Sequence, residues 1–462
     1  MYLAPDGTVE ACCWTGQIWG RTGDGPHRDS LRTIWDGLDR ERQRVAVEAG
    51  DFSHGCQECA AATLAGNDAW SGARIFDPFG TREPADWPER MHFALSNTCN
   101  LMCVMCNGSL SSAIRAKREH RPPMAPVYGE AFFAELAEFV PHLRAAIFTG
   151  GEPFLCRPTR RVWDLMLELG VPDEVEVTTN ATVWSDRLAR YVCELEVDVT
   201  VSIDGLTAET NEATRVGVDH AAMLRNVAAM RREMEPFGGR LSINFCLMTH
   251  NCHELGDLLL WADGIDGQVQ VSTVTRPPHL SLFRQPYAEV AAKVRLLDAQ
   301  DATMRARLGR NLGVWEGELA RLHRQLDALR DDAGQPVFLR SAVEGKVAEA
   351  RAELASWAAA EPLVVELVHE VIGRLDVPAW ASWCDQDRLV GADGSELMTA
   401  FADALGPLHD LVTTQPAVDV SEYRVRFGEG SGASEVRGVR LESADADGNR
   451  RDVVLVALRH GG

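Results

Sequence analysis

Three closely spaced cysteines constrain this chain of 462 residues more than any other feature of its sequence. Cys99, Cys103 and Cys106 stand in the run Ser-Asn-Thr-Cys-Asn-Leu-Met-Cys-Val-Met-Cys, with the spacing CxxxCxxC. Three such thiolates can hold three irons of a [4Fe–4S] cluster and leave the fourth iron without a protein ligand, so that a small molecule can chelate it. Zinc is the alternative, although a structural zinc site usually takes four ligands from two separated pairs.

A second motif follows about forty residues later, in the run Ala-Ala-Ile-Phe-Thr-Gly-Gly-Glu-Pro that ends at Pro153. It reads as a short apolar strand followed by the glycine pair Gly150 and Gly151 and the carboxylate of Glu152. Glycines at a strand end allow a ligand to approach the backbone closely, and exposed carbonyls beside a carboxylate suit an ammonium group. Alone the motif could be an ordinary turn, but behind CxxxCxxC it indicates a cofactor site.

Together the two motifs resemble those of the radical S-adenosylmethionine (radical SAM) superfamily, and the resemblance covers roughly residues 91–300. It implies that Cys99, Cys103 and Cys106 hold a [4Fe–4S] cluster and that SAM chelates the fourth iron. It also implies that a reduced cluster splits SAM into methionine and a 5′-deoxyadenosyl radical, which takes a hydrogen atom from substrate carbon. The residues that it assigns to SAM binding are Gly150, Gly151, Glu152, Pro153, Asn180, Ser202 and Arg215.

Residues 86–300 are expected to form one domain, because strand-like and helix-like segments alternate along most of it. Such alternation predicts an α/β fold with a parallel sheet and helices outside. Six units match the partial (β/α)6 barrel of radical SAM enzymes, with helices expected over about 186–194 and 221–234. The predicted strands are His92–Ser96, Ala145–Thr149, Glu174–Asn180, Val197–Ile203, Leu241–Thr249 and Gln268–Thr275.

Four of these strands carry polar side chains on one face only. In the strand 241–249, for example, Ser242, Asn244 and Cys246 alternate with apolar residues. A strand buried on both faces would be nearly all apolar. We therefore expect a polar lumen that holds a polar substrate and cofactor, and a partly solvated sheet edge is the alternative.

Residues 1–85 are expected to form a small cysteine domain. A β-hairpin at Pro5-Asp6-Gly7 and a helix over about 30–50 would bring Cys12 and Cys13 toward Cys56 and Cys59, and two separated cysteine pairs make a metal site. Zinc with four thiolates is one reading. The order of features also resembles a SPASM or twitch domain, which implies an auxiliary [4Fe–4S] cluster. In most such enzymes this domain follows the barrel, whereas here it precedes the barrel, as in one subfamily of twitch-containing radical SAM proteins. That subfamily has a further cysteine upstream of Pro-Asp-Gly, so the fourth ligand here stays open.

In residues 301–462 the alternation of strand-like and helix-like segments gives way to long charged stretches, and we expect an α+β region of unknown role. Charged amphipathic stretches over 287–332 and 342–375 predict helices. Strands are expected over 422–427 and 453–458, with a hairpin turn at 447–449. The region could cap the barrel or mediate formation of a homodimer.

The composition limits the kinds of partner that the protein can bind and the cellular compartment in which we expect it. With 68 acidic against 46 basic residues the net charge is −22, which argues against a nucleic acid or an anionic membrane as partner. We find no signal peptide and no apolar run long enough to span a membrane, and therefore expect a cytoplasmic protein. Twelve cysteines then favour metal binding or catalysis over disulfides.

The leading interpretation is a radical SAM enzyme that acts on a small polar metabolite in specialised biosynthesis, such as a sugar, an aminocyclitol or an amino acid. A flavodoxin- or ferredoxin-type donor would supply the electron. After hydrogen abstraction, an auxiliary cluster could accept an electron and give oxidation, or a thiol could return a hydrogen atom and give epimerisation. Cys246 is the candidate donor because it lies on the lumen face, unless it is simply a buried small residue. The alternatives are a peptide-modifying maturase and a non-catalytic iron–sulfur or zinc protein.

Overall fold

The structure of the protein is a computed structural model. It divides into two units: one formed by Met1–Cys246, Glu254–Ser272 and Arg307–Val314, and one formed by Leu247–His253, Thr273–Ala306 and Trp315–Gly462. The helix expected over 342–375 and the turn expected at 447–449 lie outside the described residues. The structure describes residues 1–64, 72–79, 85–274, 280–282, 285 and 287–328, and the strands 337–339, 384–385, 388–390, 419–427, 434–444 and 450–459.

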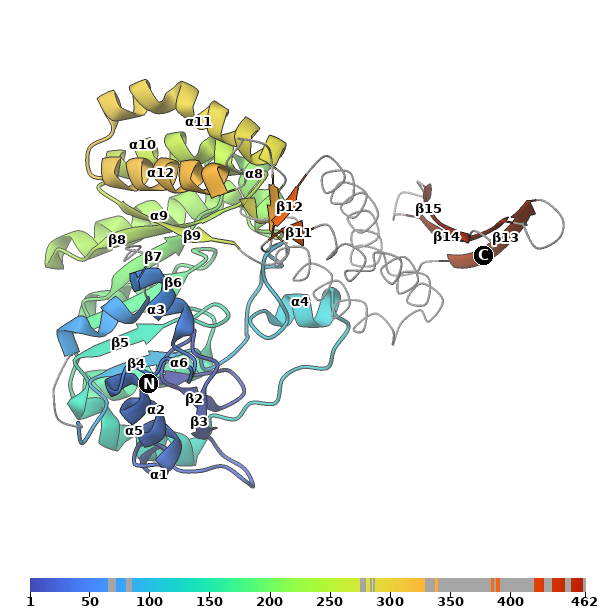
Figure 1. The fold of residues 1–462 in the computed structure, drawn as a ribbon. Coiled ribbons are helices and arrows are strands. Elements are labelled where there is room, and N and C mark those ends of the chain that lie inside the picture. Colours follow the sequence, from blue (N-terminus) through green and yellow to red (C-terminus); the bar gives the residue numbers. More distant parts are fainter. Residues whose placement is uncertain are drawn as a thin grey trace. The chain divides into compact units, whose positions relative to one another are not determined.

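A nine-stranded sheet organises the first unit, with the order β3-β2-β1-β4-β5-β6-β7-β8-β9 (Figure 1). Neighbouring strands from β4 to β8 run parallel, so the fold is α/β with a mostly parallel sheet, as expected for a partial radical SAM barrel. The six predicted strands are β4 to β9, with ends that differ by a few residues. The bounds are β1 Tyr2–Leu3, β2 Thr8–Glu10, β3 Ile18–Arg21, β4 Arg90–Phe93, β5 Ala145–Phe148, β6 Glu174–Thr179, β7 Asp198–Ser202, β8 Leu241–Leu247 and β9 Gln268–Thr273.

Helices follow the strands of this sheet in the chain. The helix α7 has the bounds that its sequence predicts, because the Ser185 hydroxyl caps its first turn by accepting from the Leu188 amide. The helix expected over 30–50 is two helices, α1 and α2, because the backbone is extended at Gly37. The bounds are α1 Leu31–Trp35, α2 Leu38–Glu48, α3 Gln57–Leu64, α4 Ser112–Lys117, α5 Glu130–Phe139, α6 Arg157–Leu169, α7 Asp186–Glu194, α8 Ala208–Thr214, α9 His220–Met234 and α10 Leu255–Gly264, with short 3-10 turns at Gly72–Phe79, Val140–His142, Glu235–Phe237 and Cys252–Glu254.

One face of the sheet packs in the core and the other is polar. Phe93 and Phe148 pair across β4 and β5 with ring centroids 5.0 Å apart. Trp163 of α6 meets the Phe148 ring edge-on at 5.6 Å, so the helix covers this face. Along β8, buried and half-buried residues alternate strictly, and the half-buried ones are Ser242, Asn244 and Cys246. The predicted alternation of this strand is therefore confirmed.

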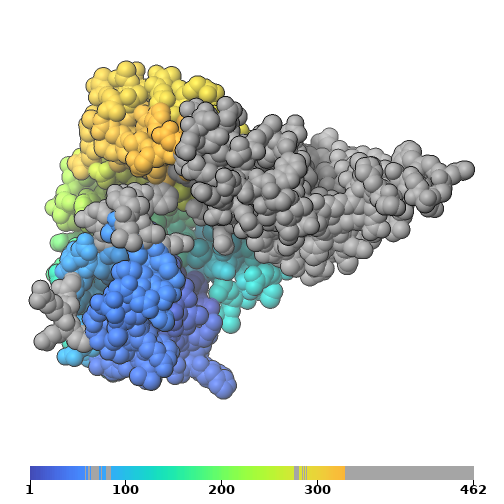
Figure 2. Space-filling model, in the orientation of Figure 1, coloured from blue at the N-terminus to red at the C-terminus, as the bar shows by residue number. Residues whose placement is uncertain are grey.

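The N-terminal segment joins the same sheet. β1 and β2 form the predicted antiparallel hairpin, with Gly7 in the left-handed region at φ 84°. β1 also runs parallel to β4, with Leu3 opposite Phe93. Figure 2 shows the N-terminal residues, in blue, as a continuous area on the visible surface of the first unit. These strands extend the sheet of the barrel, and a separate N-terminal domain stays a prediction.

The second unit contains helices and two small sheets. The stretch expected to be helical over 287–332 is two helices, and the Trp315 indole joins them by donating to Asp301 at 2.8 Å. The C-terminal strands form a three-stranded antiparallel sheet, because β14 lies between the two that were predicted. Within the described residues, no helix is long and apolar enough to cross a membrane. The bounds are α11 Tyr287–Arg307, α12 Leu312–Ala328, β10 Val337–Leu339, β11 Cys384–Asp385, β12 Arg388–Val390, β13 Asp419–Phe427, β14 Ser434–Ala444 and β15 Arg450–Arg459.

Candidate functional site

The CxxxCxxC loop follows β4 and is fixed by the helix after it. Ser112, the first residue of α4, accepts a hydrogen bond from the Cys99 amide at 3.1 Å and donates one to the Cys99 carbonyl at 3.0 Å. Arg118, directly after α4, donates to the Cys103 carbonyl at 3.3 Å. The loop backbone is therefore held in place by groups other than the thiols, which leaves the three sulfurs available to a ligand.

The three thiols lie close enough together to affect one another's pKa. Burial, together with the nearby Cys103 and Cys99, raises the pKa of Cys106 to about 11. The side-chain nitrogen of Asn180 lies 3.8 Å from the Cys99 sulfur, and Arg215 Nη1 lies 3.8 Å from the Cys103 sulfur. N–H groups that face sulfur favour the thiolate form that a cluster requires.

The donor set of this loop fits a [4Fe–4S] cluster. It offers three cysteine sulfurs as ligands. The guanidinium of Arg215 is buried beside them, and its Nε has no hydrogen-bond partner among the described residues. Across the same residues, no three His, Cys, Asp or Glu side chains are already gathered around a metal position. The fit thus rests on the chemistry of the donors and on how the loop is held.

The Gly-Gly-Glu-Pro loop packs directly against the segment that precedes Cys99. The Gly151 amide donates to the Ser96 carbonyl at 3.0 Å. A Cβ atom on Gly151 would lie 2.3 Å from the Thr98 carbonyl oxygen, and Gly150 has a φ of 103°. The sequence predicted close approach of a ligand to these glycines. In the structure, the neighbouring loop approaches them closely, so the glycines position the cysteine loop, and the approach of a ligand stays a prediction.

Glu152 is buried and its carboxylate accepts hydrogen bonds from the chain itself. It accepts from the Phe154 amide at 3.0 Å, the Thr179 hydroxyl at 2.7 Å and the Asn180 amide at 2.7 Å. Burial raises the pKa of Glu152, and these three donors oppose the rise. The carboxylate therefore joins the loop after β5 to the end of β6. The predicted contact with the SAM amino group stays a prediction.

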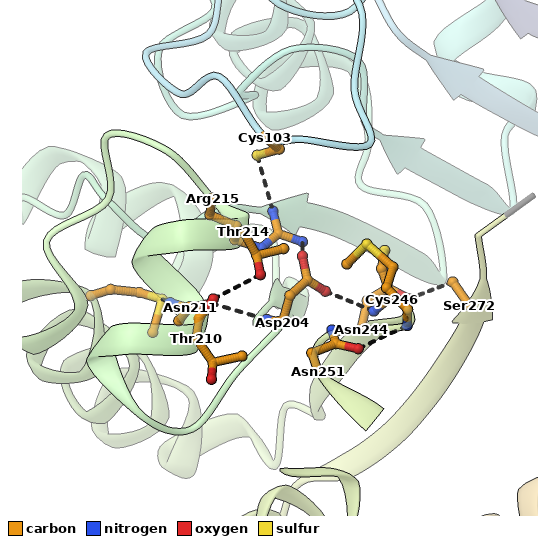
Figure 3. Close-up of polar contacts among 12 residues, drawn as sticks. Cys103, Asp204, Thr210, Asn211, Thr214, Arg215, Asn244, Cys246, Asn251 and Ser272 are labelled. Carbon is orange, nitrogen blue, oxygen red and sulfur yellow. Dashed lines mark hydrogen bonds and ion pairs between the residues drawn. The ribbon is translucent and has the colours of Figure 1, made fainter. Parts of the chain in front are cut away.

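A buried ion pair links the cysteine loop to β8. Arg215 Nη2 lies 2.8 Å from Asp204 Oδ2, and Asp204 also accepts from the Cys246 amide at 2.7 Å. Figure 3 shows the Arg215 side chain between Cys103 and Asp204. Burial raises the pKa of Asp204, and Arg215 opposes the rise. The backbone around the pair is fixed by Asn211, which accepts from the Asp204 amide at 3.0 Å.

Glu254, next to α10, supports the loop between β7 and α8. Its carboxylate accepts from the Leu206 amide at 2.5 Å and the Thr207 amide at 3.0 Å, and also from the Thr207 and Thr210 hydroxyls at 2.5 Å each. Burial raises the pKa of Glu254, but these donors outweigh it and the net direction is down. Sequence reasoning missed this residue, because nothing in its local pattern indicates contacts nearly fifty residues away.

The polar face of the sheet continues beyond the ion pair. Ser202 is nearly buried at the end of β7, opposite Asn244 of β8. Asn244 accepts from the Ser272 hydroxyl at 2.7 Å, and its nitrogen lies 3.9 Å from the Cys246 sulfur. Burial raises the pKa of the Cys246 thiol above its usual range, so this side chain keeps its proton at neutral pH.

Three of the four N-terminal cysteines share a cavity of about 660 Å³ in the first unit. Cys12, Cys56 and Cys59 line it, whereas Cys13 is an exposed residue and does not. Gln43 is buried beside them, and its nitrogen lies 3.9 Å from the Cys56 sulfur. Aromatic side chains form much of the wall, including Trp14, Trp19, Trp35, Phe52, Phe76 and Phe79. Metal binding by these cysteines stays a prediction.

The structure thus brings most of the predicted residues into one network around the cysteine loop. Glu254 and Arg118 are the supporting residues that were not singled out. Asp204 carried a sequence signal, since it continues the polar face of its strand two residues after Ser202. The predicted residues in the network are Cys99, Cys103, Cys106, Gly150, Gly151, Glu152, Pro153, Asn180, Arg215 and Cys246.

Comparison with known proteins assigns a class to this part of the chain. Residues 93–262 match the family model described as the Radical SAM superfamily. The chain therefore contains a radical SAM domain, which includes the cysteine loop, the Gly-Gly-Glu-Pro motif and the buried ion pair. No curated protein matches the chain.

Solved structures of radical SAM enzymes are similar to part of the chain. One is anSMEcpe with bound AdoMet, at 15% identity and a TM-score of 0.34, over 47% of this chain and 62% of that one. Another is a radical SAM methyltransferase from Sphaerobacter thermophilus, at 19% identity and a TM-score of 0.27, over 37% of this chain and 54% of that one. The match thus spans less than two thirds of the length of either structure.

Proposed function

We propose that the protein is a radical SAM enzyme that abstracts a hydrogen atom from a small polar metabolite. When bound, the [4Fe–4S] cluster supplies the electron that cleaves SAM into methionine and a 5′-deoxyadenosyl radical. The observation that carries the proposal is the fixed loop with Cys99, Cys103 and Cys106, joined by Arg215 and Asp204 to a polar sheet face. The protein's own part is to orient SAM and substrate and to exclude water.

The polar face of the sheet supports the proposed substrate class. Ser202 and Ser272 present hydroxyl groups near the carboxyl ends of β7 and β9, and Asn244 presents an amide in the middle of β8. Such groups hydrogen-bond the hydroxyls or amines of a sugar, an aminocyclitol or an amino acid. A panel of these compounds, assayed for stimulation of 5′-deoxyadenosine formation, tests this part of the proposal. A substrate found only among peptides would contradict it.

The proposal includes an auxiliary [4Fe–4S] cluster on the N-terminal cysteines. Cys12, Cys56 and Cys59 line one cavity, and the Gln43 amide faces the Cys56 sulfur, as a second-layer N–H donor does in iron–sulfur sites. Such a cluster would accept the electron left on the substrate, so that the overall reaction is an oxidation.

Iron counting tests both clusters at once. Each cubane holds about four irons, so the anaerobically reconstituted protein is expected to contain about eight per chain. A variant with Cys99, Cys103 and Cys106 all changed to Ala is expected to keep about four. A fall from about four to none would show that the N-terminal cysteines hold no cluster or hold zinc, and would favour a redox-neutral reaction.

In the redox-neutral branch, Cys246 would return a hydrogen atom to the substrate radical. Its buried thiol keeps the proton that such a donor needs. In deuterium oxide, the wild type is expected to place one solvent deuterium on the product, whereas Cys246→Ala places none and still forms 5′-deoxyadenosine. Mass spectrometry of the product is the readout. A wild-type product without deuterium would exclude the thiol as donor.

A further inference from the structure

A groove lined by arginines borders the cysteine loop within the first unit. Its first part is a cavity of about 570 Å³, lined by the segment 96–98 that immediately precedes Cys99. Its second part is a cavity of about 490 Å³ that shares Tyr128, Arg157 and Pro158 with the first. We call the two together the arginine groove. The arginines that line it are Arg115, Arg121, Arg157, Arg160, Arg161 and Arg187.

The positive charge of this groove is only partly neutralised. No carboxylate lines the first part, and the second has only Glu130, which is paired with Arg161, and Asp164. Arg157 forms no ion pair with any residue that the structure describes. Arg121 forms an ion pair of 3.5 Å with Glu119, and its side chain is more than half exposed. Such a concentration of cations is unusual in a chain with a net charge of −22.

The groove is connected directly to the loop that would carry the cluster. Ser112 lines the groove and exchanges hydrogen bonds of 3.1 and 3.0 Å with the Cys99 backbone. Arg118, which belongs to the same basic segment as Arg115 and Arg121, donates to the Cys103 carbonyl at 3.3 Å. A partner seated in the groove would therefore lie against the segment next to Cys99.

We propose that the arginine groove docks an acidic one-electron donor protein that reduces the cluster. This inference rests on the proposed function, because the cluster needs one electron for each cleavage of SAM. One electron passes from the reduced donor to the oxidised cluster, the donor becomes oxidised by one electron, and no bond forms or breaks. Opposite charges steer such partners together, and redox complexes bury little surface and dissociate readily.

Binding of a purified, oxidised flavodoxin to the full reconstituted chain tests the docking independently of turnover. The groove variant is Arg121→Glu with Arg157→Glu. The matched control is Arg225→Glu with Arg232→Glu, which changes the charge equally at two exposed positions of α9. At 50 mM salt we expect the groove variant to raise Kd at least ~10-fold and the control less than ~2-fold, and wild-type binding to weaken as salt rises. Isothermal titration calorimetry gives these values.

Two results would overturn the docking proposal. One is an equal Kd for the groove variant and its control. The other is unchanged flavodoxin binding together with selective loss of an acidic test peptide, because the groove would then serve a peptide. Failure of the proposed function would appear elsewhere: wild-type protein that does not cleave SAM with dithionite refutes the enzyme assignment, whatever the titration shows.

Discussion

Replacing Cys103 by alanine is expected to reduce cleavage of SAM to the background level. When one of the three cysteines that hold a [4Fe–4S] cluster is removed, one iron loses its protein ligand. Cys103 is a buried residue whose sulfur lies 3.8 Å from Arg215 Nη1, and alanine offers no sulfur at this position. The measurement is 5′-deoxyadenosine formed by the anaerobically reconstituted and reduced protein, quantified by mass spectrometry.

Cys193→Ala is the matched control for this prediction. Cys193 lies on α7, and its thiol donates to the Glu233 carbonyl at 3.5 Å, away from the cysteine loop. This variant is expected to cleave SAM within about twofold of the wild type, because a surface substitution of this kind changes little. If Cys103→Ala also kept its cleavage activity, the assignment of the cluster to this loop would be wrong.

The sequence predicted the elements of this site well because their signals are local. The alternation of polar and apolar residues in β8 follows from the two-residue period of a strand, and it placed Cys246 on the polar face. The bounds of α7 follow from its capping residue and its periodicity. The cysteine spacing likewise needs no knowledge of the fold, since the three ligands lie on one loop.

The contacts between distant segments could not be predicted in this way. Gly151 must be glycine because the Thr98 carbonyl comes so close, and that contact joins two loops over fifty residues apart. Glu152 is used to hold the end of β6, which its position in a motif does not reveal. The pairing of β1 with β4 also depends on the finished sheet, so local sequence patterns could not predict it.

Asp204→Ala is expected to destabilise the protein by about 3–5 kcal/mol, because it leaves a charged guanidinium buried without its partner. The Arg215 side chain is only 8% exposed and that of Asp204 is fully buried. The substitution also removes the acceptor of the Cys246 amide, which lies in β8. The free energy of unfolding, from urea titration of the cluster-free protein followed by tryptophan fluorescence, is the readout. SAM cleavage should fall as well, since Arg215 would no longer be held beside Cys103.

Asp36→Ala provides the control, because it breaks an ion pair with Arg32 of 2.6 Å in which both side chains are well exposed. Exposed pairs contribute about 0–1 kcal/mol, so a loss in that range is expected. The double variant Asp204→Leu with Arg215→Met removes both charges and should regain most of the lost stability, yet leave SAM cleavage impaired. Equal losses for Asp204→Ala and Asp36→Ala would show that the buried pair is not an important source of stability. Full activity in the double variant would show that the guanidinium serves only to hold the fold.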